Sequence, residues 1–415
     1  MAESWYKLDN VAKLFVATNS RRDPRVFRIS CTLNEEIDPA ALDKALAKTA
    51  KLFRGFQVTL HQGLFWHYFE ATDKVPHAVP ETLPPCSALY DEAHRNGLLY
   101  RVCWYGSRIT LEMFHALSDG TGGLGFLQTL VCLYLKEKHP EALADAVPEY
   151  DATAAERDCD SYRKFYGSRK APADKKTRAY QLHSLHLPYD QSQFFEVHVP
   201  AGKLIAEAKG CGVSATSWLA AQLLLAIRAD MPLLEKGRPV VLSLPVNLRN
   251  YYPSATARNF FNTIKVPCVF TGEETLEELA RTFDENLRGQ LTKENIMAQM
   301  DGFEKLERFA GVKPVPLVLK NPTVRFFNWL EKRRETATIS NLGRVKADPA
   351  LQPYIRGYSA WCSTSALFIT VCSYGDDMVL GVTSTYRSTD VLKDLVRGLS
   401  RAGLDVALYA SEVRG

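Results

Sequence analysis

The sequence contains no run of 18 consecutive apolar residues, so it predicts no membrane-spanning helix. Its first residues, MAESWYKLDN, lack the basic and apolar regions of a signal peptide. With 51 basic and 47 acidic residues the net charge is +4, and the large basic excess of many nucleic-acid-binding proteins is missing. We therefore expect a soluble, cytoplasmic protein with no nucleic-acid partner.

Cysteine pairs are also missing, although nine cysteines are present. The number is odd and no two cysteines form a C-x-x-C pair. Most lie among apolar neighbours, which favours buried free thiols over disulfides or zinc ligands. His183 and His186 are three residues apart, but nothing in the sequence marks the further ligands that a metal site needs. The sequence predicts no metal and no bound cofactor.

Motifs that define several other enzyme classes are absent. There is no Gly-Lys-Ser/Thr of a P-loop and no G-x-S-x-G of a serine hydrolase. Gly120, Gly122 and Gly125 do fit G-x-G-x-x-G. A dinucleotide site also needs a second strand with an acidic residue roughly 20 residues further on. Here the expected helix, from about Gly123 to Lys138, leads into a polar segment instead, so we reject both nucleotide-binding interpretations.

The most informative stretch is ITLEMFHALSDGTGGLG, residues 109–125. Its first six residues predict a buried strand, and His115 follows at the end of that strand. A histidine side chain in this place can take up a proton near pH 7. With Asp119 and Gly120, the pattern resembles the HxxxDG signature of the chloramphenicol-acetyltransferase-like acyltransferases, a superfamily that includes condensation domains. Members often carry a second histidine before the catalytic one; Phe114 stands there, and several acyltransferase branches also lack that histidine.

The order of predicted elements agrees with this resemblance along nearly the whole chain. The first half reads as a strand, a helix starting at Asp38-Pro39, two hairpins and the helix after the motif. The second half reads as alternating strands and helices. In sequence order, the strands are expected at 25–33, 56–60, 64–70, 98–104, 109–115, 194–199, 238–245, 264–270, 366–374 and 378–384, and helices at 201–209, 218–228 and 390–402.

The resemblance implies an α/β fold of two lobes, each a mixed β-sheet flanked by helices, with an active-site tunnel between them. We place the first lobe at residues 1–175, because a polar, proline-bearing segment follows it, and the second at 176–415. Arg249 after a strand and Phe-Phe-Asn-Thr at 260–263 resemble condensation-domain segments. Ser340-Asn341-Leu342-Gly343 resembles a Ser-Asn-x-x-Gly turn of the superfamily.

The resemblance further implies an activity and roles for these residues. An acyl group would pass from acyl-CoA, or from acyl-phosphopantetheine on a carrier protein, to a small alcohol or amine, with His115 as general base. Asp119 would either orient His115 or form a structural ion pair with Arg249. Gly120 would allow an unusual backbone and leave space beside the histidine. Asn262, Ser340, Asn341 and Gly343 would line the substrate site, with the first three as candidate oxyanion donors.

Two other interpretations keep the same fold. A non-catalytic relative would bind an acyl carrier or another ligand, and a stand-alone condensation domain would form amides. We expect a monomer in either case. Tunnel volume sets acyl chain length and acceptor shape, so the sequence names neither substrate.

Residues 313–334, VKPVPLVLKNPTVRFFNWLEKR, predict an amphipathic element near a tunnel mouth. We expect the prolines to break regular structure and a helix to start at Thr323. Phe326, Phe327 and Leu330 then cluster at helical spacing beside several cations. This element would be mobile and would admit an acyl chain, guide an anionic donor or rest on a membrane face. The alternative is an ordinary surface helix whose aromatic residues belong to the core.

Overall fold

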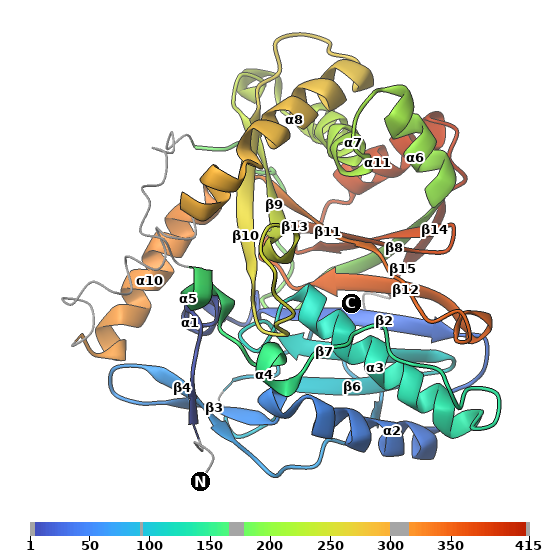
Figure 1. The fold of residues 1–415 in the computed structure, drawn as a ribbon. Helices are drawn as coiled ribbons and strands as arrows, with labels where there is room; N and C mark the ends of the chain where they lie inside the picture. The colour runs from blue at the N-terminus through green and yellow to red at the C-terminus, as the bar shows by residue number, and fades with distance from the viewer. Residues whose placement is uncertain (1–4, 92–93, 166–177, 299–314, 412–415) are drawn as a thin grey trace.

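The computed structural model describes residues 5–91, 94–165, 178–298 and 315–411. Two β-sheets face each other, and each carries helices on its outer side (Figure 1). The predicted α/β fold with two sheet-and-helix lobes is confirmed.

The first sheet has five strands in the order β12-β2-β7-β6-β5. β2, β6, β7 and β12 pair antiparallel, and the short β5 pairs parallel with β6. Helices α2 and α3 pack together over this sheet, and their apolar faces form one core with its strands. The elements are β2 (Val26–Leu33), β5 (Val79–Pro80), β6 (Tyr100–Tyr105), β7 (Arg108–Phe114), β12 (Ile355–Cys362), α2 (Pro39–Leu52) and α3 (Gly120–Lys138).

The second sheet has seven strands in the order β10-β9-β11-β13-β14-β8-β15. Four helices cover its outer face and enclose a second core. The elements are β8 (Gln193–Pro200), β9 (Val240–Asn247), β10 (Phe261–Cys268), β11 (Ala337–Arg344), β13 (Leu367–Tyr374), β14 (Asp377–Ser384), β15 (Ala407–Ala410), α6 (Ala201–Gly210), α7 (Ala215–Asp230), α8 (Leu276–Gln290) and α11 (Asp390–Arg401).

Smaller elements surround the two sheets. A three-stranded sheet has the order β1-β4-β3, and α10 stands at the outer edge of the molecule beside α1 (Figure 1). The elements are β1 (Trp5–Lys7), β3 (Val58–Gln62), β4 (His67–Ala71), α1 (Asn10–Thr18), α4 (Ala154–Arg157), α5 (Ser161–Phe165) and α10 (Leu317–Lys332), with 3₁₀ turns at Arg54–Phe56, Leu233–Glu235, Leu248–Asn250 and Gln352–Tyr354.

Strand β12 links the two halves of the chain. It lies late in the sequence but pairs with β2 in the first sheet, and its backbone presses on β14 of the second. A Cβ at Gly381 would lie 1.8 Å from the carbonyl oxygen of Ala360, so only glycine allows this approach. Trp361 adds a hydrogen bond to the carbonyl of Phe195 at 3.0 Å. The boundary between residues 175 and 176 stays a prediction. β12 follows this boundary in the sequence but belongs to the sheet of the first lobe.

Several local predictions need correction. The helix after the HxxxDG motif begins at Gly120, not near Gly123, so the glycine-rich segment is its first turn. Residues 340–343 lie in strand β11, with a bulge between Asn341 and Gly343, and do not form a turn. Helix α10 begins at Leu317 and contains Pro322, so Thr323 does not start it. Residues 313 and 314 lie outside the described residues.

Within the described ranges, no single helix is long and apolar enough to cross a membrane. The pair α6 and α7, bent by 85°, passes that test jointly by length and composition alone. Most side chains of α7 are buried in the second core, as expected for a core helix.

Candidate active site

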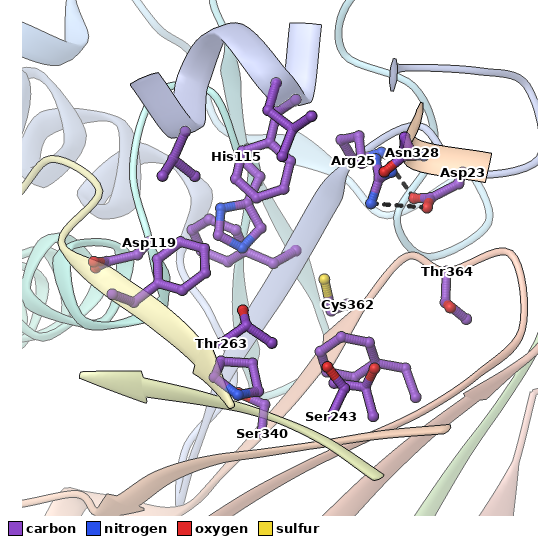
Figure 2. Close-up of a pocket in the computed structure, with 18 of the residues that line it drawn as sticks. Asp23, Arg25, His115, Asp119, Ser243, Thr263, Asn328, Ser340, Cys362 and Thr364 are labelled. Atoms are coloured by element: carbon purple, nitrogen blue, oxygen red, sulfur yellow. Dashed lines mark hydrogen bonds and ion pairs between the residues drawn. The ribbon is translucent and has the colours of Figure 1, made fainter. Parts of the chain in front are cut away.

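A cavity of about 2350 Å³ lies between the two lobes. His115, Asp119 and Gly120 line it from the first lobe, and Asn262 and Ser340 line it from the second. In Figure 2 the imidazole of His115 faces across the cavity toward Thr263 and Ser340. The structure thus gathers the residues of the HxxxDG motif and those of the later segments around one space.

The backbone at His115 is held by two distant segments. His115 follows the last residue of β7, and its amide donates to the carbonyl of Arg25 at 2.7 Å. The Asn259 side-chain amide donates to the carbonyl of His115 at 3.0 Å. Arg25 has a φ of +55°, a strained value for a non-glycine residue, and its side chain pairs with Asp23 at 3.1 Å (Figure 2). The strand end carrying His115 is therefore fixed from both lobes.

Aromatic rings surround the imidazole of His115. The Phe15 ring stacks on it with centroids 4.2 Å apart, and Phe27 meets it edge-on at 5.1 Å. The Phe261 ring lies 5.6 Å away on the second lobe. Burial lowers the pKa of His115 below its usual 6.5, although the Asp119 carboxylate opposes this effect. His115 is therefore neutral at pH 7 and able to accept a proton.

Phe114 has a place in the core and not in the cavity. It is fully buried, pairs with Val26 across the sheet and lies 5.6 Å from the ring of Tyr90. Successive residues at a strand end point to opposite faces. A residue directly before His115 therefore faces the core under the sheet, which accounts for phenylalanine at this position.

Asp119 and Arg249 form the ion pair that was one of the two roles expected for Asp119. Arg249 Nη1 donates to Asp119 Oδ2 at 2.8 Å, and both side chains are largely buried. The same oxygen accepts from the amide of Phe260 at 2.8 Å, and Oδ1 accepts from the amide of Gly122 at 3.0 Å as the N-cap of α3. Both carboxylate oxygens are thus engaged away from His115.

Arg249 extends this network across the second lobe. Its guanidinium also donates to the carbonyls of Thr256 and Arg258, at 2.8 and 2.7 Å. Asn247 Oδ1 accepts from Arg249 at 3.2 Å, and the Asn247 amide donates to Thr121 Oγ1 at 3.1 Å. The segment that carries Asn259 is therefore tied to the start of α3.

Gly120 has a different role from the one expected. Its φ is not in the left-handed region, so the backbone at this position is ordinary helix. A Cβ there would lie 2.6 Å from Leu342 Cδ2 in β11. The glycine therefore leaves space for the second lobe, and the predicted unusual backbone is wrong.

The neighbouring Gly122 is under a stricter constraint, which yields a prediction. Its Cβ would lie 2.0 Å from the carbonyl oxygen of Ala257, whereas that of Gly120 meets only the end of a leucine side chain. Gly122→Ala is expected to destabilise the protein by about 1–3 kcal/mol, as overpacking does, and Gly120→Ala by clearly less. Chemical denaturation of both variants measures the difference. Equal stability of the two variants would contradict this packing.

The predicted substrate-binding residues occupy different parts of the second lobe. Ser340 and Asn262 line the cavity from β11 and β10. Asn341 also borders it, but its amide donates to Thr216 Oγ1 at 2.8 Å and its Oδ1 accepts from the amide of Gly343 at 2.7 Å. Gly343 has a φ of +80°, as the bulge requires. Asn341 and Gly343 thus shape the strand, and Ser340 keeps a hydroxyl toward the cavity.

Sequence reasoning missed three residues that hold the site. Phe15 lies on α1, a nine-residue helix that was not predicted, although Asp9 gives it an N-cap. Asn259 directly precedes the segment singled out at 260–263 and received no role. Arg25 was placed in a strand, and no local signal revealed its left-handed backbone.

The described part of the chain offers no cluster of metal ligands, and the cysteine at the cavity is not a thiolate. No group of three or more His, Cys, Asp or Glu side chains there is arranged to hold a metal ion. Cys362 borders the cavity, but burial raises the pKa of its thiol to about 12. This cysteine is protonated at neutral pH and is a poor nucleophile.

Comparison with known proteins supports the fold. The sequence matches no family model, and no curated protein matches it. Among solved structures, polyketide synthase associated protein 5 from Mycobacterium tuberculosis is similar at TM-score 0.63, with 16% identity over 95% of this chain and 96% of that one. TRI101 of F. graminearum, complexed with coenzyme A and T-2 mycotoxin, aligns at TM-score 0.65, with 10% identity over 97% and 99%.

A third structure completes the comparison. A variant of the starter condensation domain of rhizomide synthetase, in complex with C8-CoA, aligns at TM-score 0.62 with 11% identity over 96% of this chain and 94% of that one. These likenesses extend along the chain. The protein therefore has the chloramphenicol-acetyltransferase-like fold that condensation domains share with CoA-dependent acetyltransferases.

Proposed function

We propose that this protein transfers an acyl group from a thioester to an alcohol or amine, with His115 as general base. The observation that carries the proposal is a neutral, aromatic-enclosed histidine that faces the cavity between the lobes. The similar proteins crystallised with coenzyme A or C8-CoA support acyl-CoA as the donor class. Acyl-phosphopantetheine on a carrier protein would present the same thioester.

The reaction needs one proton to move in and out of His115. The imidazole takes the proton of the acceptor hydroxyl or amine while that atom attacks the thioester carbonyl. The tetrahedral intermediate collapses with cleavage of the carbon–sulfur bond, and the leaving thiolate receives the proton from the imidazolium. The products are an ester or amide and a free thiol, and His115 is neutral again.

The developing oxyanion needs a donor from the opposite side of the cavity. The hydroxyls of Ser340 and Thr263 belong to residues that line that side (Figure 2), and Asn262 of β10 lines the cavity as well. We assign oxyanion stabilisation to this group, because a fixed donor there acts on charge that develops only in the transition state. The ion pair between Asp119 and Arg249 holds the two lobes in a fixed relative position around the cavity.

The direct assay is thiol release from a panel of acyl-CoA donors, with and without pooled alcohols and amines. Release that depends on an acceptor supports acyl transfer. Release without any acceptor would indicate thioester hydrolysis instead, and no release with any donor would contradict the proposal.

The lowered pKa of His115 predicts a pH dependence. A base must be unprotonated to act, and a lowered pKa keeps His115 unprotonated as the pH falls below 6.5. The acid limb of kcat/KM is therefore expected below pH 6.5, and activity at pH 6.5 should remain above half of its plateau. A limb centred above pH 6.5 would contradict the buried, neutral histidine.

A further inference from the structure

Helix α10 exposes most of its large apolar side chains to solvent, whereas an ordinary surface helix buries them. Leu317 is the buried residue of the helix. We define the outer face of α10 by side chains that share one side at helical spacing. These are Val318, Leu319, Phe326, Trp329 and Leu330, which are 73, 62, 56, 47 and 38% exposed. The interpretation of this segment as a helix with a core aromatic face is therefore wrong.

The inner side of α10 includes the apolar Leu317 and Val324, but it meets the rest of the protein largely through hydrogen bonds of polar side chains. Lys320 Nζ donates to the carbonyl of Phe65 at 3.1 Å, and Arg325 Nε donates to that of Ala17 at 2.8 Å. Lys332 Nζ donates to Asp23 at 3.2 Å and to Ser365 at 2.6 Å. An ordinary surface helix buries its apolar stripe and shows its polar side to water. Here that arrangement is reversed, so the outer face is suited to an apolar partner.

A second apolar element lies beside the start of α10. The amide of Leu317 donates to the carbonyl of Leu64 at 2.9 Å, which joins the helix to the β3–β4 hairpin. At that hairpin Leu64 and Trp66 are well exposed. The helix and the hairpin tip together give an apolar surface that is longer than the helix alone.

The charges on α10 identify the chemistry of the partner. Residues 317–334 contain five basic residues and one acidic residue, Glu331. Glu331 is engaged by Lys265 and Arg334, at 3.0 and 2.7 Å, and borders the cavity on the inner side. Arg333 stacks on the Trp329 ring of the outer face at 3.7 Å. The outer face is thus aromatic and aliphatic, and the charged side chain that contacts it is the Arg333 cation.

We propose that the outer face of α10, together with the β3–β4 hairpin tip, docks this protein on the surface of an anionic lipid bilayer. Aromatic and aliphatic residues on one side of a helix flanked by cations are the composition of interfacial helices. Trp66 and Trp329 have the amphipathic rings that favour the headgroup region. Among the described residues, α10 stands at the edge of the molecule (Figure 1), and the side chains of its outer face are exposed there.

Docking has a consequence for the cavity. Val324 and Phe327, on the same helix, line the cavity that contains His115. A docked protein would hold this wall of the cavity against the bilayer, where an acyl substrate with a long apolar chain is dissolved. This consequence rests on the proposed acyl transfer, whereas the docking itself does not.

The test is vesicle co-sedimentation of the full chain with two lipid compositions, phosphatidylcholine alone and phosphatidylcholine mixed with phosphatidylglycerol. The protein is expected to bind the mixed vesicles more tightly, and added salt should weaken this binding. The double variant Phe326→Ser/Trp329→Ser should lose at least about tenfold in partitioning, because each ring leaves the lipid. Arg333→Gln should lose about fivefold on the mixed vesicles and little on phosphatidylcholine alone.

A matched control comes from two exposed leucines outside α10 and the β3–β4 hairpin. Leu233 and Leu234, in a 3₁₀ turn of the second lobe, are almost fully exposed. Leu233→Ser/Leu234→Ser also removes two exposed apolar side chains, but not from the proposed docking surface. This variant should therefore bind vesicles as the wild type does. Thermal melting checks that both double variants are folded.

Three outcomes would overturn the docking proposal. In the first, the wild type stays in solution with both vesicle types. In the second, Phe326→Ser/Trp329→Ser binds as tightly as the wild type. In the third, sedimentation velocity shows a dimer that this double variant dissociates, which would assign the outer face to a second copy of the chain. Thiol release with water-soluble substrates is measured separately, so its failure would contradict the proposed function and leave the docking result intact.

Discussion

Replacing His115 with alanine is expected to lower acyl transfer by roughly 10²–10⁴-fold while the protein stays folded. The imidazole of His115 faces the cavity and is neutral at pH 7, so its loss removes the proposed base and leaves the substrate site in place. The ring contacts with Phe15 and Phe27 are lost as well, which predicts a modest fall in melting temperature. Acceptor-dependent thiol release under saturating donor measures the effect.

His77→Ala is the matched control for this substitution. His77 is exposed and lies against Asp43 in the first lobe, away from the residues that line the cavity. Its replacement should leave thiol release unchanged. A folded His115→Ala variant that keeps more than about a tenth of wild-type turnover would exclude His115 as the general base.

Asp119→Asn is expected to lower stability and activity together. The substitution leaves Arg249 buried without its countercharge, and breaking such a pair costs on the order of 3–5 kcal/mol. Arg249→Ala should resemble it, because the carbonyls of Thr256 and Arg258 lose their donor as well. Chemical denaturation gives the loss of stability, and thiol release on the same samples gives the loss of activity.

The double variant Asp119→Asn/Arg249→Ala tests whether the two residues stabilise the protein as a pair or independently. If Asp119 and Arg249 act together, removing both costs much less than the sum of the single losses. The exposed pair Lys393 and Asp390 on α11 is the control, for which little or no coupling is expected because solvent screens an exposed pair. Additive losses at Asp119 and Arg249 would contradict the pairing. Loss of activity with unchanged stability would instead favour Asp119 as the residue that orients His115.

Local sequence patterns predicted the part of the site that local physics determines. The apolar run at 109–114 ended in a histidine and a helix N-cap, and β7, His115 and α3 follow in that order. Asp38-Pro39 starts helix α2, as the side chains of these two residues predict. A pairing that spans the whole fold, Asp119 with Arg249, was reached only through the resemblance.

Distant contacts explain what the sequence did not reveal. Residues 340–343 have turn-like composition, yet they form a bulged strand because β13 pairs with them on one side. Helix α10 contains Pro322 and an outward apolar face, so neither helix propensity nor periodicity predicted its start or its orientation. Phe15 and Asn259 reach His115 from 100 and 144 residues away, and no local pattern marks such a contact.

The most direct measurement follows the acyl group itself. Wild-type protein and His115→Ala are incubated with carbonyl-¹³C-labelled acyl-CoA and the pooled acceptors, and the products are identified by mass spectrometry. We predict a labelled ester or amide, formed in equal amount with free CoA, from the wild type and a trace from His115→Ala. An intact labelled thioester with every acceptor, although acyl-CoA binds to the protein, would contradict acyl transfer and indicate a protein that only binds its ligand.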